Sequence, residues 1–384
     1  MRKLAVLLFF VAVAIPALAV KRLTLKQLDQ ALADVGSKPD QEVARSLSGL
    51  ELTERMSTQE LMRWKSAMPG LQSRLALTAL ADASVFLSPP SEATTKTAPM
   101  DTDAQRQLLS LSSAYVEKAM RKLPNFFASQ AVVTFEDTPG ARNSGGVIVY
   151  KPLHYVNFVR ADVLYRNGRE VKETLTGELS EKDQASSRLL FTGEFGPILN
   201  TVLADAQQGK LTWSHWEAGV SSQVAVFRYS VARGKSHCTV KILLPGSGYA
   251  NQTRPGYHGE IAVDPISGTI LRLTLIADLI SDDPMSTANL MVEYGPVEIG
   301  GQAYICPIRS VTLVMAYPQN AKESVAEVAQ SAGGGHGGAQ VFTSNRDIPP
   351  QTLLNDVAFE RYHVLRSDAR IITGPEMQDE KKSP

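Results

Sequence analysis

The segment that decides the fold is YHGEIAVDPISGTILRLTLIA, residues 257–277. On both sides of its centre, apolar side chains alternate with polar or small ones, which is the period of a β-strand with one buried face. The central residues, Asp264 to Gly268, are of the types that form tight turns. We therefore expect two antiparallel strands, 257–263 and 269–277, joined by this turn.

Similar alternating runs follow one another from about residue 129 to residue 365. Asn167-Gly168 lies between two of them and indicates a hairpin, because both residues tolerate positive φ. The expected strands are 131–136, 146–150, 155–165, 169–175, 211–217, 223–232, 237–244, 257–263, 269–277, 289–298, 302–317 and 354–365. Helical spacing is expected at 103–122 and again at 196–206.

Most of the connections between these strands are short, which favours antiparallel neighbours. The sequence therefore predicts an α+β fold. Its main element is a large curved antiparallel sheet, half-barrel-like, with one or two helices packed on it.

The part of the chain before residue 89 has a helical pattern. Ser57-Thr58-Gln59-Glu60 is a capping box, and Leu61, Trp64 and Met68 follow at helical spacing. Residues 89–102 are rich in Pro, Thr and Ser, which is typical of a linker. The expected domains are a signal peptide at 1–19, a small helical bundle at 20–88, this linker, an antiparallel β domain with an inserted helix at 103–373, and a disordered tail at 374–384.

The N-terminus resembles a secretory signal peptide. Arg2 and Lys3 precede an apolar run from Leu4 to Ile15, and Ala17-Leu18-Ala19 is a small-residue cleavage site. The run is shorter than the roughly 20 residues that span a membrane, and no later segment is long and apolar enough. We expect an exported protein, periplasmic or extracellular after cleavage near Ala19, with no membrane span in the mature chain. An uncleaved N-terminal anchor is the alternative.

Charge and cysteine content narrow the classes of partner. Lys and Arg number 39, as do Asp and Glu, so the chain has no basic excess for nucleic acid. The only two cysteines, Cys238 and Cys306, could form one disulfide after export. The alternative is two buried free thiols. Neither cysteine has a second ligand at zinc-binding spacing, so we expect no metal and no cofactor.

Several short motifs stand out beyond these patterns. They are Gly193-Glu194-Phe195-Gly196, Trp213-Ser214-His215-Trp216-Glu217, Val226-Phe227-Arg228-Tyr229-Ser230-Val231, Tyr257-His258-Gly259-Glu260, and Val292-Glu293-Tyr294-Gly295 with Gly300-Gly301. Together they resemble a group of uncharacterised exported proteins of soil bacteria, a group that implies no activity. Residues 50–55 are similar to a helical module beside that domain.

A more distant resemblance concerns layout. With its D-P-x-S-G turn between two long strands, the region 103–372 is similar to the half-barrel carriers of bacterial lipoproteins and to related envelope-stress regulators. That resemblance implies a curled antiparallel sheet lined with helices, with an apolar concave face. A shared fold does not by itself imply a shared function.

The sequence contains none of the motifs H-E-x-x-H, Walker loop, G-x-S-x-G or C-x-x-C, so no catalytic residue is predicted. Weak candidates for a site are Trp213, His215 and Glu217, which share a face of one expected strand, and His258 and Glu260, which share a face of another. A histidine beside a carboxylate could hold a metal or act as an acid–base pair. The alternative is an aromatic cluster with His215 and Glu217 at its solvated rim, and a structural His258.

Three functions remain open on these grounds. The leading hypothesis is a non-enzymatic envelope protein that binds or carries a lipid, an acyl chain or a lipidated ligand. The second is a protein-interaction or regulatory module that contacts an envelope partner through residues 20–88. The third is a metal-assisted hydrolase built on His215 and Glu217 or on His258 and Glu260.

Overall fold

The computed structural model describes residues 20–138, 151–172, 197–219, 222–243, 250–283, 285–316 and 350–365. The signal peptide, the strand expected at 146–150 and the tail expected at 374–384 lie outside these residues. Among the described residues, no helix is long and apolar enough to cross a membrane.

Residues 20–84 form a small helical unit. Its helices are α1 (Leu25–Ala31), α2 (Asp40–Ser48), α3 (Thr58–Ala67) and α4 (Leu71–Ser84). The expected capping box is present: Ser57 Oγ accepts from the backbone N–H of Glu60, and the Glu60 carboxylate accepts from the N–H of Ser57. The sequence did not indicate the two short parallel strands of this unit, β1 (Lys21–Leu23) and β2 (Leu50–Leu52).

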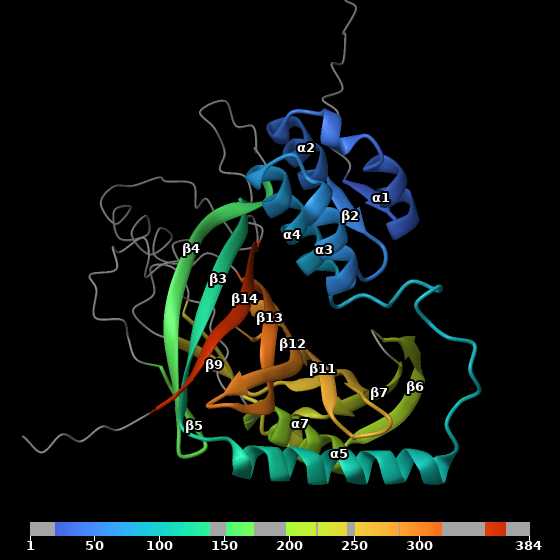
Figure 1. Ribbon diagram of the computed structural model, residues 1–384, viewed down its shortest axis with the longest axis vertical. Helices are drawn as coiled ribbons and strands as arrows, with labels where there is room; N and C mark the ends of the chain where they lie inside the picture. Colours follow the sequence, from blue (N-terminus) through green and yellow to red (C-terminus); the bar gives the residue numbers. More distant parts are fainter. Residues whose placement is uncertain are drawn as a thin grey trace, which may run out of the picture.

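A single large sheet dominates the rest of the described chain. Its strand order is β5-β4-β3-β14-β13-β12-β11-β10-β7-β6, and every neighbouring pair is antiparallel. The bounds are β3 Phe126–Thr138, β4 Lys151–Arg166, β5 Arg169–Lys172, β6 Lys210–Ala218, β7 Gln223–Val231, β10 Gly256–Val263, β11 Ile270–Asp278, β12 Met285–Ile299, β13 Gln302–Ala316 and β14 Gln351–Val364. The sheet is curved (Figure 1), so the predicted α+β class with a curved antiparallel sheet is confirmed.

Both predicted turns are present. Asn167 and Gly168 have φ values of 53° and 77° between β4 and β5. In the turn between β10 and β11, the Asp264 carboxylate accepts from the backbone N–H groups of Ile266 and Ser267. Gly268 closes this turn with a φ of 72°. The residue types at these positions therefore fix the register of two hairpins.

One expected strand differs. The run at 237–244 was expected to join the sheet, but of its described residues only Val240–Leu243 form a strand, β8, which pairs with β9 (Ala250–Thr253) in a separate hairpin. As a result, β10 pairs directly with β7.

Helices cover both faces of the central strands. The helices α5 (Thr102–Lys122) and α7 (Pro197–Gln208), close to the two predicted, pack on one face, where they share a core with Leu290 and Val292 of β12. The alternate residue, Met291, packs with Ala79 of α4 on the opposite face. In Figure 1, α5 and α7 accordingly lie below the sheet and α1–α4 above it.

The segment expected as a linker runs along the edge strand β6. The N–H of Thr95 donates to the carbonyl of Trp216, and the N–H of Ala218 donates to the carbonyl of Ala93. The indole N–H of Trp216 donates to the carbonyl of Ala98 at 2.9 Å. These contacts occupy backbone groups that an open sheet edge would expose.

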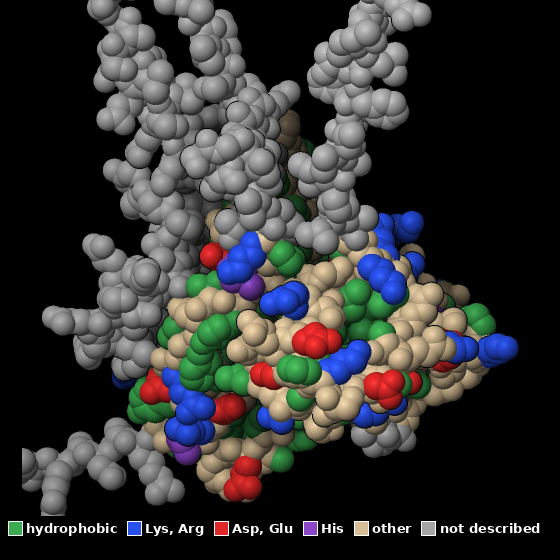
Figure 2. Space-filling model, turned by 90° about the horizontal axis from the view of Figure 1, so that it is seen from above, with side chains coloured by type: hydrophobic (Ala, Val, Ile, Leu, Met, Phe, Trp, Pro, Cys, Tyr) green, Lys and Arg blue, Asp and Glu red, His purple; other side chains and the backbone are tan. Residues whose placement is uncertain are grey.

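Charges of both signs are mixed on the described part of the face seen from above. In the view from above, Lys and Arg side chains alternate with Asp and Glu side chains, and no broad area of one sign stands out (Figure 2). That face offers no basic surface of the kind that follows a nucleic-acid backbone.

Candidate functional site

Strand β6 supplies the first part of the site, with a geometry that differs from the expected one. A register shift between Trp213 and His215 places Trp213 with Trp216 against Phe227, in the core shared with α5 and α7. His215 and Glu217 instead contact side chains on the face that carries α4. The expectation that Trp213 shares a face with His215 and Glu217 is therefore wrong, because a bulge reverses the alternation of side chains.

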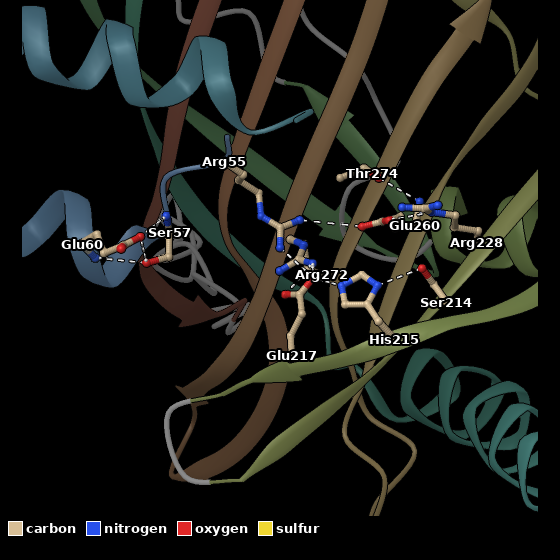
Figure 3. A network of polar contacts seen from close by, with 10 residues as sticks. All are labelled: Arg55, Ser57, Glu60, Ser214, His215, Glu217, Arg228, Glu260, Arg272 and Thr274. Carbon is tan, nitrogen blue, oxygen red and sulfur yellow. Dashed lines mark hydrogen bonds and ion pairs between the residues drawn. The ribbon is translucent and has the colours of Figure 1, made fainter. Parts of the chain in front are cut away.

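Glu217 is the centre of a buried ionic network (Figure 3). Its Oε1 lies 2.6 Å from Nη2 of Arg55, and Nη2 of Arg272 on β11 lies 2.9 Å and 3.0 Å from its two oxygens. Nε2 of His215 is 3.0 Å from Oε1 of Glu217. Glu217 is only 6% exposed, so it is not at a solvated rim as the alternative interpretation held.

The arrangement around His215 indicates its tautomer. Because the Glu217 carboxylate can only accept, Nε2 of His215 carries the proton and donates. In the neutral ring this leaves Nδ1 to accept from the Ser214 hydroxyl, which lies at 2.8 Å. Both ring nitrogens are engaged, so His215 is held in place by its neighbours (Figure 3).

Arg55 joins the two pairs of candidate residues. It lies between β2 and α3 in the helical unit and contacts Glu217 on β6. Its Nη1 also lies 3.7 Å from Glu260 on β10, whose other oxygen accepts from Nε of Arg228 at 3.0 Å. His258 pairs separately with Asp278 at 2.7 Å, and both of these side chains are about half exposed.

The network sets the charge of Glu217. Burial alone would raise the pKa of this carboxyl, but the hydrogen bond from His215 and the charges of Arg272 and Arg55 hold the pKa far below its usual range. Burial lowers the pKa of Arg55, Arg272 lowers it further, and Glu217 and Glu260 oppose this. Glu217 is thus a fixed anion between two guanidinium groups, a setting that repels a metal cation.

A second buried cluster fastens α4 to the sheet. Arg309 on β13 contacts Asp82 of α4, Asp356 of β14 at 3.0 Å, and the hydroxyl of Thr58 at 3.0 Å. Thr58 in turn donates to Glu293 of β12. Desolvation and the charge of Asp356 raise the pKa of Asp82 well above its usual range, although Arg309 opposes the shift.

A cleft opens beside the first network, where the residues after α4 meet β7, β10 and β11. Its volume is about 200 Å³. Its apolar lining residues are Val85, Phe86 and Leu87, which follow α4, and Ile276 of β11. Its polar lining residues include Arg55, Arg228, His258, Glu260 and Thr274, and His258 is the strand partner of Ile276. Four of the five weak candidates thus lie in or next to one site: His258 and Glu260 line the cleft, and His215 and Glu217 lie in the network behind it.

Comparisons with known proteins return a distant likeness of fold. No family model matches the chain, and no curated protein matches it. A solved structure of a LolA superfamily protein from Nitrosomonas europaea is similar over 68% of this chain and 97% of its own, with 11% sequence identity and a TM-score of 0.26.

The cysteines are free. Cys238 and Cys306 are both buried, and they lie in different apolar clusters. Of the two alternatives left open by the sequence, the structure has the buried thiols. Burial raises the pKa of Cys238 to about 11 and that of Cys306 to about 12, so neither is a ready nucleophile. Among the described residues, no group of His, Cys, Asp and Glu is arranged to hold a metal.

Sequence reasoning missed the arginines. Arg272 and Arg309 interrupt apolar runs of β11 and β13, and this was the available signal that each needs a buried partner. Arg55 carries no such signal, because it lies in a polar loop and its partner Glu217 is 162 positions away.

Proposed function

We propose that the protein is a non-enzymatic binding protein whose cleft takes an amphiphilic ligand, such as a lipid, an acyl chain or a lipidated ligand. The observation that carries this proposal is the cleft itself, which is lined both by the apolar side chains of Val85, Phe86 and Leu87 and by the charged side chains of Arg228 and Glu260. Specific ligand sites commonly combine an apolar lining with a few placed polar groups. The volume suits the part of a ligand where the head group joins the chain.

The hydrogen bonds and ion pairs that His215 and Glu217 already make also favour a binding function over a catalytic one. His215 uses both ring nitrogens, and Glu217 is held by two arginines. A hydrolase would need a carboxylate or imidazole free to accept a proton from water or to ligate a metal. His258 uses one ring nitrogen among the described residues, and its partner there is Asp278 and not Glu260.

The proposal is tested by native mass spectrometry of the protein purified gently from its own compartment, followed by titration with a fluorescent fatty acid. We expect a bound acyl-chain compound or saturable uptake of the probe. Ile276→Asp replaces an apolar lining residue of the cleft with a carboxylate and should abolish uptake, whereas Ile266→Asp, at a position 81% exposed in the β10–β11 turn, should not. Absence of both a co-purified ligand and saturable uptake would refute the proposal.

Export belongs to the same proposal. In this view residues 1–19 direct the chain out of the cytoplasm and are removed near Ala19. N-terminal sequencing of the protein from its native cells should begin close to Val20. A chain that retains Met1 would contradict cleavage.

The second candidate function is contact with an envelope protein through residues 20–88. Two apolar side chains of this unit, Met62 of α3 and Leu71 of α4, are 62% and 69% exposed. If the unit binds a partner by a surface that includes both side chains, the double change Met62→Glu and Leu71→Glu should abolish co-purification of that partner. Retention of the partner by the double variant would exclude this surface.

A further inference from the structure

The charges that meet at the cleft do not cancel. The network contains three guanidinium groups, those of Arg55, Arg228 and Arg272, but only two carboxylates, those of Glu217 and Glu260. The half-exposed pair of His258 and Asp278 lies nearby, where water screens its charge. The buried guanidinium groups of Arg55 and Arg272 are matched by the two carboxylates, so the positive charge left over in the network is that of the exposed Arg228.

Arg228 presents that excess to the cleft. Its side chain is 59% exposed and lines the cleft, and among the described residues it makes one hydrogen bond, from Nε to Glu260. The two terminal amino groups of its guanidinium therefore remain available as donors. A planar guanidinium with free donors matches the geometry of carboxylate and phosphate groups.

The apolar side chains of the cleft determine where the hydrocarbon chain of an anionic ligand would lie. Phe86, Leu87 and Ile276 lie in the same cleft as Arg228. Leu87 is 37% exposed, an open apolar side chain beside a charged site. The hydrocarbon end of an anion bound to Arg228 would thus be within the same cleft as these apolar side chains.

We propose that the cleft selects an amphiphile whose head group is an anion, a carboxylate or a phosphate, and that Arg228 binds this group. The inference rests on the proposed binding function and narrows it to one class of head group. Neutral and cationic amphiphiles of the same chain length bind more weakly, because they cannot form an ion-paired hydrogen bond with the terminal amino groups of Arg228.

Isothermal titration calorimetry of the mature chain tests this with a matched set of probes. Decanoate and decyl phosphate carry the anion, and decanol and decyltrimethylammonium carry the same chain without it. Acetate and inorganic phosphate carry the anion without the chain. We expect decanoate and decyl phosphate to bind about tenfold or more tightly than decanol, which is the order of one charge-assisted hydrogen bond. Acetate and phosphate should bind more weakly than their chain-bearing counterparts.

Three variants identify the residue responsible. Arg228→Gln should weaken decanoate binding about tenfold and leave decanol unchanged. Glu260→Gln removes the competing carboxylate and should strengthen decanoate binding. Arg160→Gln is the matched control, because Arg160 is a half-exposed arginine on a strand, 3.6 Å from Glu360, and does not line the cleft. It should bind every probe as the unchanged protein does.

The outcomes separate the two proposals. If no chain-bearing probe binds, the binding function fails and this inference with it. If decanol binds as tightly as decanoate, or if Arg228→Gln weakens both equally, the binding function stands and the anionic head group is refuted. If inorganic phosphate binds as tightly as decyl phosphate, the cleft is a site for free anions, and the amphiphile is refuted.

Discussion

Nη2 of Arg55 lies 2.6 Å from Oε1 of Glu217, although 162 positions separate the two residues along the chain. Both side chains are about 8% exposed. Arg55 lies in the loop before α3, and Glu217 lies on β6, an edge strand of the large sheet. The ion pair therefore joins the helical unit to the sheet, and it fixes the position of Arg55, which lines the cleft.

Removing Arg55 should destabilise the fold strongly. Arg55→Ala leaves Glu217 with one cationic partner fewer in a buried site, and loss of one partner of a buried pair costs about 3 to 5 kcal/mol. Urea unfolding should show this as a lower midpoint. Arg63→Ala breaks an ion pair with Asp29 in which both side chains are more than 60% exposed, and it should cost less than about 1 kcal/mol. Equal losses in the two variants would show that the Arg55 pair is not buried in solution.

The low pKa of Glu217 predicts a particular acid sensitivity. The folded protein keeps this carboxylate ionised, whereas the unfolded chain binds a proton near the ordinary value of 4.5. The unfolded state thus holds more protons below that pH, and the stabilising contribution of Glu217 is lost as the pH falls below about 4.5. Asp82, whose pKa is raised, acts in the opposite direction, so the measurement has to be a difference between variants.

That difference is between the unchanged protein and Glu217→Gln. Unfolding free energies measured from pH 7 down to pH 3 should differ most at neutral pH and converge toward acid pH. The variant keeps Asp82 and Arg309, which cancel in the comparison. Parallel curves over the whole range would mean that Glu217 has an ordinary pKa in the folded protein.

Structural features that depend on neighbouring residues could be predicted from the sequence, whereas those that depend on residues far apart along the chain could not. Asp264-Pro265-Ile266-Ser267-Gly268 and Asn167-Gly168 are local signals, and both turns are present as predicted. The strands β1 and β2 are three residues each and too short to show a period. The edge contacts of residues 93–98 were hidden by a composition typical of a linker.

The candidate site was predicted in its residue types but not in its contacts. His215, Glu217, His258 and Glu260 were selected as histidine–carboxylate pairs within single strands. The contacts of these side chains depend on two features of the folded chain. One is the bulge after Trp213, and the other is the position of Arg55, which lies far away in the sequence but contacts Glu217. Both depend on tertiary packing, which a strand's own alternation does not encode.

The two cysteines give a direct chemical test of the structure. Because burial raises the pKa of both thiols, neither should react with Ellman's reagent at pH 8 in the folded protein. After unfolding in guanidinium chloride without reductant, two thiols per chain should react. If none reacts in the denatured protein and both appear after reduction, the disulfide alternative holds instead.

Gly259 on β10 should not tolerate a side chain, and the reason lies next to the cleft. A Cβ atom at this position would lie 1.9 Å from the carbonyl oxygen of Thr274 and 3.0 Å from the hydroxyl of Tyr229. That hydroxyl donates to the same carbonyl oxygen, at 2.6 Å. An added methyl group would force β10 away from β11, and overpacking of this kind costs about 1 to 3 kcal/mol or more.

Gly234 provides the control, because a Cβ atom there would have no atom within 4 Å. Gly259→Ala should lower the thermal unfolding midpoint by several degrees, while Gly234→Ala should leave it nearly unchanged. Because Gly259 lines the cleft together with Glu260 and Arg228, the Gly259 variant should also bind decanoate more weakly at temperatures where it is still folded. A Gly259→Ala protein as stable as the Gly234→Ala control would show that β10 and β11 are not as closely paired at this point as the structure has them.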